Sequence, residues 1–186
     1  MIEFSSIARG TKAVDALIKK APVEVVRVGT LQPGKLAVLF CGDVASVDAA
    51  HEEAIRVGAD TVADEVMLPL VEASVYRAAL GQRGDWAGDT LGVVEVSSLA
   101  GTIEAADAAV KGAEVRVVSM RLGDELGGKG LAHLVGEQHD VEAALELAQA
   151  RAQKRDRQLQ VSITPRHDGD LWSRLSATTR FWGEAT

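Results

Sequence analysis

The sequence contains an internal repeat whose period is close to half the chain, and this feature restricts the fold more than any other. Ser5-Ser6 and Ser97-Ser98 match at an offset of 92 positions, and further matches follow at the same offset. They pair Asp15 with Asp107, Lys19 with Lys111, Val23 with Val115, Val25 with Val117 and Val26 with Val118. After a two-residue insertion the offset is 94, which pairs Gly34-Lys35 with Gly128-Lys129, Gly42 with Gly136 and Val47 with Val141. Solenoid units are much shorter than this period, so the chain is predicted to contain one small domain twice.

Both repeats carry the same order of predicted elements. Apolar residues share one helical face between positions 7 and 20, and a run of valines follows Pro22. The predicted elements of the first repeat are a strand at 2–4, a helix at 7–20, strands at 23–28 and 36–41, a helix at 44–57, a strand at 62–68 and a short helix at 74–80. Those of the second are a strand at 91–96, a helix at 99–112, strands at 114–122 and 131–135, a helix at 138–155 and a strand at 159–163.

This order is typical of a ferredoxin-like (βαββαβ) domain. The chain is therefore predicted to be an α+β protein with two tandem domains of this type, each a four-stranded antiparallel sheet with helices. We expect the first domain at 1–82 and the second at 90–186, including a C-terminal tail. Residues 83–89 are rich in Gly and Asp without a period, and we interpret them as the linker.

Composition excludes several classes of protein. The net charge is −7 and the chain has no basic run, whereas nucleic-acid binding needs clustered Lys and Arg. No apolar run approaches the roughly 20 residues of a membrane span, and the N-terminus has no signal segment. Cys41 is the only cysteine, so an intrachain disulfide is excluded and a reducing compartment is expected. These features favour a cytoplasmic protein that binds neither nucleic acid nor membrane.

The sequence offers little catalytic chemistry. Its four histidines show no metal-ligand spacing, and no Ser-His-Asp or paired-carboxylate pattern can be found. The Gly-rich run at 127–130 lacks the Ser or Thr that follows Lys in a phosphate loop, so turn geometry explains its glycines. Cys41 ends an apolar strand and is interpreted as a buried, inert thiol. The chain is thus predicted to be an assembly element and not an enzyme.

Two stretches of the repeat resemble a known family. The second repeat opens with LGVVEVSSLAGTIEAADAAVKGAEVRVV, and the first shows the pattern more weakly as SSIARGTKAVDALIKKAPVEVV. This pattern resembles the shell domain of bacterial microcompartments, the BMC domain. Two such domains in one chain resemble the trimeric shell proteins, closest to the type whose first hairpin reads T-x-C-P-G-K. The resemblance implies a structural shell protein, a pseudohexameric trimer that tiles into the shell facet around a central metabolite pore.

The resemblance also implies tile-edge contacts. In the family a lysine late in the first helix packs against its counterpart across the seam, and Lys19 and Lys111 occupy that position. On spacing alone, a solvated lysine at a helix C-terminus is favoured. Arg166 after Pro165 matches a second edge residue of the family, but the first repeat has Leu70 there. Half of the edges are therefore expected to lack that arginine contact.

Hairpin tips gather on the ring axis in this family, and they are the expected pore lining. The candidate pore residues are Leu31, Gln32, Pro33, Gly34, Gly123, Asp124, Glu125, Leu126, Gly127 and Gly128. In the related type, a cysteine before Pro-Gly-Lys is associated with an iron–sulfur cluster, and Gln32 replaces it here. An amide is a poor substitute for thiolate ligands, so we expect no cluster, no other cofactor and no metal. Asp124 and Glu125 either form a ring of negative charge or are ordinary solvated turn carboxylates.

The implied partners are two further copies of the chain, hexameric and pentameric shell proteins at the tile edges, encapsulated enzymes, and small metabolites in the pore. The implied location is a microcompartment shell in the cytoplasm. Two alternatives remain open from the sequence. One is a small-molecule-binding regulatory protein of ferredoxin-like architecture, and the other is a redox-conducting shell pore, which Gln32 makes less favourable.

Overall fold

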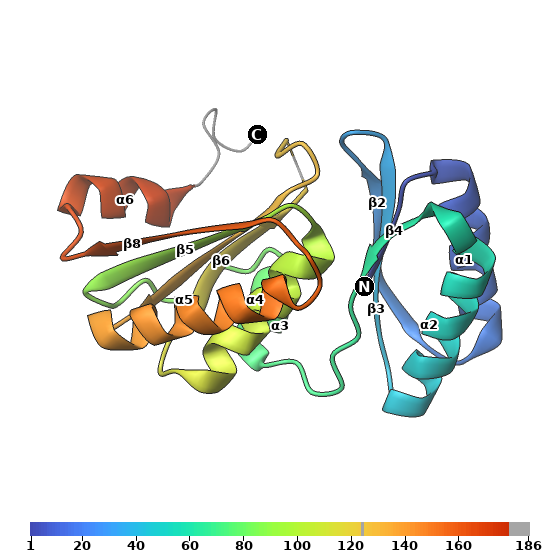
Figure 1. The fold of residues 1–186 in the computed structure, drawn as a ribbon, viewed down its shortest axis with the longest axis horizontal. Helices are drawn as coiled ribbons and strands as arrows, with labels where there is room; N and C mark the ends of the chain where they lie inside the picture. Colours follow the sequence, from blue (N-terminus) through green and yellow to red (C-terminus); the bar gives the residue numbers. More distant parts are fainter. Residues whose placement is uncertain (124, 179–186) are drawn as a thin grey trace.

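The computed structural model describes residues 1–123 and 125–178 and contains two sheets with helices on them (Figure 1). The first repeat consists of β1 (Ile2–Phe4), α1 (Ile7–Lys20), β2 (Glu24–Leu31), β3 (Lys35–Cys41), α2 (Val44–Gly58), the 3-10 turn η1 (Ala59–Thr61) and β4 (Val62–Glu65). After α3 (Ala73–Ala79), the second repeat consists of β5 (Thr90–Val96), α4 (Leu99–Gly112), β6 (Arg116–Leu122), β7 (Gly130–Gly136), α5 (Gln138–Gln153), β8 (Leu159–Pro165) and α6 (Gly169–Ala177).

The two sheets have the same topology. Their strand orders are β2-β3-β1-β4 and β6-β7-β5-β8, and all strand pairs among the described residues are antiparallel. The first strand of each repeat is therefore a central strand, paired on both sides by strands far along the chain. This arrangement confirms the predicted α+β class with two ferredoxin-like domains.

Matching serines start matching helices. Ser6 Oγ accepts a hydrogen bond from Arg9 N–H (3.4 Å) and Ser98 Oγ accepts one from Gly101 N–H (3.1 Å), which satisfies a free donor in each first turn. The two helices differ in burial. α1 buries four residues, a single face against its own sheet, whereas α4 buries ten of its 14 residues. This difference arises because α4 also contacts the first domain, while the outer face of α1 is open to solvent.

The domains pack side against side. In Figure 1 the helices α1 and α2 cover one face of the first sheet, and the other face looks toward the second domain. The first core is closed by Ile2, Phe4, Leu36 and Val38 against α1 and α2. The second core is larger and includes Val75 and Ala79 of α3, with Met1 and Leu39 of the first sheet packed against it. The second domain thus covers part of the outer face of the first sheet, while most of β2 is exposed.

One expectation from the sequence needs correction, and one segment has a further role. The last strand of the first repeat ends at Glu65 and not at 68, because β1 is short and pairs with β4 only from Ile2 to Phe4. The 83–89 segment does more than connect the domains, since Trp86 is only 7% exposed and packs on the outer face of the second sheet. Trp172 of α6 joins it there, with the rings edge to face at 5.2 Å.

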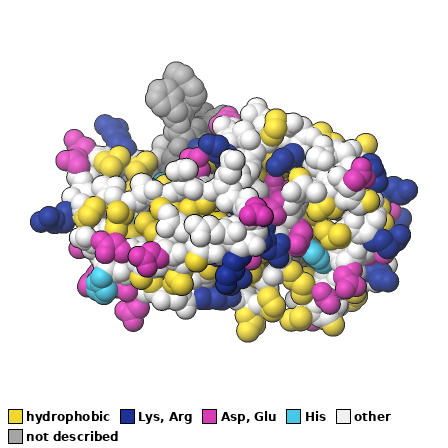
Figure 2. Space-filling view, viewed as in Figure 1, with side chains coloured by type: hydrophobic (Ala, Val, Ile, Leu, Met, Phe, Trp, Pro, Cys, Tyr) yellow, Lys and Arg dark blue, Asp and Glu magenta, His cyan; other side chains and the backbone are white. Residues whose placement is uncertain are grey.

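The described surface carries mixed charges. Figure 2 shows Lys and Arg interspersed with Asp and Glu over this face, and hydrophobic side chains gathered at its lower edge near the connection between the domains. The exposed large apolar residues of the described chain include Ile7, Ile18, Val28, Val44, Leu70 and Val71. None of the described helices is both long and apolar enough to span a membrane.

Candidate functional site

The two hairpin tips, β2–β3 and β6–β7, lie side by side at one end of the molecule (Figure 1). A Cβ atom built on Gly128 would lie 3.0 Å from Gln32 O and 3.2 Å from Pro33 Cδ. A Cβ atom on Gly123 would lie 3.1 Å from Leu31 Cδ1. The close approach requires glycine at both positions of the longer tip. The structure therefore brings together the two segments that the sequence singled out as pore lining.

The tip residues differ in exposure. Gly123 and Gly128 are buried between the tips, and Leu31 and Leu126 are partly buried. The exposed ones are Gln32, Pro33, Gly34, Glu125 and Gly127, while Asp124 lies outside the described residues. Gly34 (φ +90°) and Gly127 (φ +62°) adopt left-handed backbone conformations that favour glycine. Gln32 thus presents its amide from a tight turn, next to the second tip.

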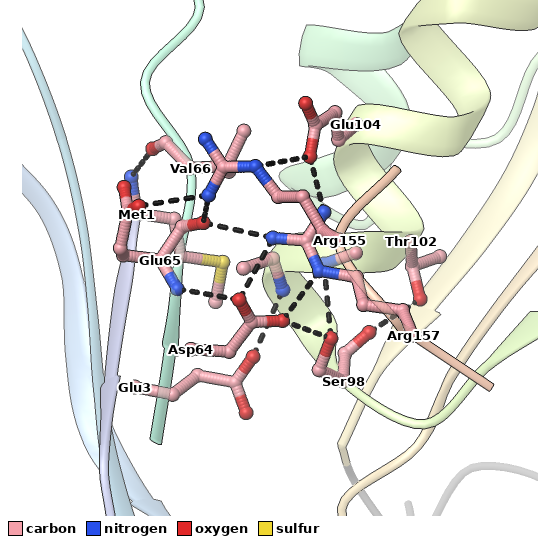
Figure 3. A network of polar contacts seen from close by, with 12 residues as sticks. Met1, Glu3, Asp64, Glu65, Val66, Ser98, Thr102, Glu104, Arg155 and Arg157 are labelled. Carbon is pink, nitrogen blue, oxygen red and sulfur yellow. Dashed lines mark hydrogen bonds and ion pairs between the residues drawn. The ribbon is translucent and has the colours of Figure 1, made fainter. Parts of the chain in front are cut away.

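A polar network joins the two domains (Figure 3). Arg157, between α5 and β8, donates from Nε and Nη2 to the two Asp64 carboxylate oxygens of β4 at 2.8 and 2.7 Å. Its Nη1 donates to Glu104 of α4, and Ser98 Oγ donates to Asp64. Arg155 Nη1 lies 2.8 Å from Glu65 Oε1. A bidentate arginine in this position fixes β4 against the start of α4.

The network is largely shielded from water, which sets its electrostatics. The Arg157 and Glu104 side chains are 5% and 6% exposed. Burial alone would raise the pKa of Asp64, but hydrogen bonds from Arg157 and Ser98 outweigh it and hold the pKa below its ordinary value. Removing one partner of such a group leaves a buried charge without compensation.

Glu3 forms a second link between the domains. Its side chain is fully buried; Oε1 accepts from Ala100 N–H in the first turn of α4 (2.9 Å), and Oε2 lies 3.3 Å from Lys35 Nζ. Burial raises the pKa of Glu3. The second repeat contains the same pair, Glu95 and Lys129, at 2.7 Å, but these side chains are 42% and 56% exposed. Among the described residues of one chain, Glu95 therefore lacks the helix N-terminus that α4 provides for Glu3.

The predicted edge lysines each pair with a carboxylate one turn earlier. Lys19 Nζ lies 2.7 Å from Asp15, and both side chains are exposed. Lys111 Nζ lies 2.6 Å from Asp107, and it also donates to Leu70 O in the connection between the domains. Arg166 is exposed and directly follows β8. Lys111 thus has a structural role inside the chain, whereas Lys19 projects from an open helix.

Sequence reasoning missed the polar centre of the second sheet. His133 Nδ1 lies 2.8 Å from Ser119 Oγ, and its ring is 5.5 Å from that of Trp86. Burial lowers the pKa of His133 to about 4, with the positive charges of Arg83 and Arg121 adding to the effect. Leu39 is its counterpart in the first repeat. Among the described residues, no three His, Cys, Asp or Glu side chains are grouped so as to hold a metal ion.

His133 should make stability depend on pH. Its folded pKa of about 4 lies below the ordinary value of 6.5, so the unfolded state binds more protons between these values. The free energy of unfolding should therefore fall as pH drops from about 6.5 to 4, by up to about 3 kcal/mol from this group. In His133→Leu that part of the slope should disappear in urea unfolding curves. His139→Leu, at a 75% exposed side chain, is the control; equal slopes in both variants would contradict the assignment.

Comparison with known proteins follows the same division into two domains. The model of the BMC domain family matches residues 1–71 and 90–167. The chain belongs to the BMC domain family. The bacterial microcompartment shell protein PduT of Citrobacter freundii is 32% identical over 175 residues, which cover 94% of this chain and 95% of the relative. The family is structural and not catalytic, which confirms the prediction of a non-enzymatic shell protein.

Solved structures show the same relationship. A microcompartment protein from Desulfitobacterium hafniense is 34% identical with a TM-score of 0.80, and the match covers 91% of this BMC chain and 94% of that one. A fused permuted hexameric shell protein from the RMM microcompartment, 24% identical, has a TM-score of 0.60 and covers 82% and 81%. The second similarity concerns the fold alone.

Proposed function

We propose that the chain forms a pseudohexameric homotrimer that tiles into a microcompartment shell facet and carries a central pore for small metabolites. The observation that supports this proposal is the contact between its own two domains. That contact is head to tail, since strands β1 and β4 of the first domain meet the start of helix α4 in the second. Its Glu3–Ala100 part has counterparts in both repeats, Glu95 for Glu3 and Ala8 for Ala100, so this part of the contact can be repeated between chains.

The unused halves of this contact lie open in a single chain. The helix-start half is α1 with its N-cap Ser6, the counterpart of α4 with Ser98, and Ile7 and Ile18 on α1 are 41% and 52% exposed. The strand half is Glu95 of β5, the counterpart of Glu3 of β1. A heterologous contact repeated around an axis closes into a ring. Three chains supply six domains, which gives the ring its pseudo-six-fold symmetry.

The hairpin tips would then surround the ring axis. They lie together at one end of the molecule, and Gln32 and Glu125 are exposed there. Three Gln32 amides would offer hydrogen bonds to water and small polar metabolites. Three Glu125 carboxylates would make the opening less favourable for anions. The amide of Gln32 and the carboxylate of Glu125 are not redox-active groups, so a metabolite pore is favoured over a redox conduit.

The absence of cluster ligands can be tested by reconstitution. After anaerobic incubation with iron and sulfide, the native chain should retain no stoichiometric iron, since an amide does not replace a thiolate ligand. Gln32→Cys is the matched positive arm and should retain iron and sulfide with a charge-transfer absorption. Stoichiometric iron in the native chain would contradict the proposed polar pore.

The tiling role can be tested at the edge. Lys19→Ala should reduce the extent of protein sheets seen by negative-stain electron microscopy while trimers persist, because its long stem and ammonium are proposed to meet the neighbouring tile. Lys111→Ala should do the same but also loosens the connection at Leu70. Lys12→Ala, on an exposed position of α1, is the control. Unchanged sheets in Lys19→Ala would refute the edge assignment, and dispersed dimers of the native chain would favour a regulatory protein.

Hexameric and pentameric shell proteins and encapsulated enzymes are the proposed partners of such sheets.

A further inference from the structure

The helices that follow the last strand of each repeat, α3 and α6, occupy corresponding positions in the chain. Glu72 is the N-cap of α3 and Asp168 is the N-cap of α6, an offset of 96 positions. Glu65 of β4 and Val161 of β8 lie opposite equivalent residues of β1 and β5 and show the same offset. This offset pairs Val75 with Leu171, Tyr76 with Trp172 and Ala79 with Leu175. The helix α6 is therefore the counterpart of α3.

Each of these helices has one side on the outer face of its own sheet. Trp172 of α6 packs against the cluster of the second sheet that contains Val135. Tyr76, its counterpart in α3, lines a cavity together with Cys41 of the first sheet, which is the counterpart of Val135. The two helices thus turn the same side toward their own domain, which leaves the opposite side for a further contact.

The opposite side of α3 is buried by the second domain. The helix contacts β6 and α4 there, and Val75, which is 0% exposed, belongs to the same core as Met120 of β6. Glu72 N–H donates to Asp107 Oδ1 of α4 at 2.8 Å, and the Asp107 side chain is 5% exposed. A buried carboxylate and a buried strand thus receive the start of α3 within the chain.

Among the described residues of a single chain, neither half of the corresponding second contact is covered. The helix α6 has no buried residue, and its Leu171 is 43% exposed. The receiving residues of the first domain are exposed as well. Val28, the counterpart of Met120, is 49% exposed, and the side chain of Asp15, the counterpart of Asp107, is 60% exposed. One chain therefore presents a helix without its receiving surface and a receiving surface without its helix.

We propose that α6 of one chain packs on α1 and β2 of the next chain, with Leu171 against Val28 and Asp168 N–H donating to Asp15. The proposal rests on the ring of three chains proposed above and names the surface through which each chain binds the next. The partner is a second copy of this chain, because the same contact is already made once inside every chain between the corresponding residues. A heterologous contact of this kind recurs at each boundary between the chains of a ring.

Leu171→Asp tests the apolar part of this contact. It should raise the dissociation constant of the trimer at least about tenfold per contact in sedimentation equilibrium, because a charge would be buried against Val28. Asp15→Ala should raise it about fivefold, which is the effect of one hydrogen bond of ordinary strength. Leu147→Asp, at a 38% exposed leucine of α5, is the matched control. Equal weakening by Leu171→Asp and Leu147→Asp would overturn the proposal.

Cross-linking locates the contact independently of these variants. In a Cys41→Ser background, Asp15→Cys and Gly169→Cys are combined and treated with a short bismaleimide. A Cβ atom on Gly169 would meet no other part of the chain within 4 Å, so this position accepts the change. The helices α1 and α6 lie at opposite ends of the chain (Figure 1), so a cross-link between them joins two chains. Covalent dimers and trimers are expected on a denaturing gel, and Glu142→Cys in place of Asp15→Cys should give none.

The outcomes separate this contact from the ring itself. A double-cysteine variant that is a trimer by native mass spectrometry but gives no cross-link between chains would overturn the contact and leave the ring intact. A native chain that forms no trimer would overturn both.

Discussion

Arg157→Ala is expected to lower the free energy of unfolding by about 3–5 kcal/mol in urea denaturation. Arg157 is the centre of the network that joins β4 to α4, and its side chain is 5% exposed. The alanine variant removes the guanidinium and leaves the largely buried Asp64 and Glu104 carboxylates without its hydrogen bonds. Arg157→Lys should recover only part of the loss. Lysine keeps the positive charge, but it lacks the planar fork of donors with which Arg157 contacts both carboxylates.

Arg151→Ala is the matched control for this result. Arg151 lies 3.6 Å from the same Glu104, but its side chain is 48% exposed. Solvent-exposed ion pairs contribute about 0–1 kcal/mol, so this variant should unfold almost like the native chain. Equal destabilisation by Arg151→Ala and Arg157→Ala would show that burial of the network does not determine its contribution.

Glu95→Ala is expected to weaken the trimer more than any other single carboxylate change on the surface. Glu3 accepts from Ala100 N–H within the chain at 2.9 Å, and Glu95 is proposed to accept from Ala8 N–H of the next chain. Hydrogen bonds to charged groups contribute about 1.5–3 kcal/mol each, and the trimer has three such contacts. Each lost contact should raise the dissociation constant of the trimer at least about tenfold, as measured by sedimentation equilibrium.

Glu142→Ala separates this contact from a general charge effect. Glu142 is an exposed carboxylate on α5 that pairs with Gln138 within the same helix. Its removal changes the net charge as Glu95→Ala does, but leaves both halves of the proposed contact intact. A trimer weakened equally by both substitutions would place the interface elsewhere.

The sequence predicted the fold well because its strongest signal was local and repeated. Two serine N-caps and two valine-rich strands recur at an offset of 92 positions, and two glycine-containing turns recur at 94, so each repeat supports the interpretation of the other. Hairpin positions also predicted the segments that meet in space, as the contact of Gly128 with Gln32 shows. The strand predicted to 68 was too long because β1 is short and pairs with β4 only from Ile2 to Phe4.

The domain interface could not be predicted from the sequence in the same way. Arg157 and Asp64 are 93 residues apart, and neither has a charge-matched counterpart that a repeat comparison would reveal. Trp86 lies in a segment without period, and its burial depends on the outer face of the second sheet. Contacts of this kind are decided by how the two domains pack, which leaves no trace in periodicity or spacing.

In the proposed ring, the contact between the two domains is repeated between chains, so that three chains close it. Native mass spectrometry of the purified chain measures this most directly. We expect a dominant species of three chains, each of 19.6 kDa. On dilution, the Glu95→Ala trimer should dissociate at a higher protein concentration than the native trimer. A native chain that remains a monomer or dimer at micromolar concentration would contradict the proposed ring.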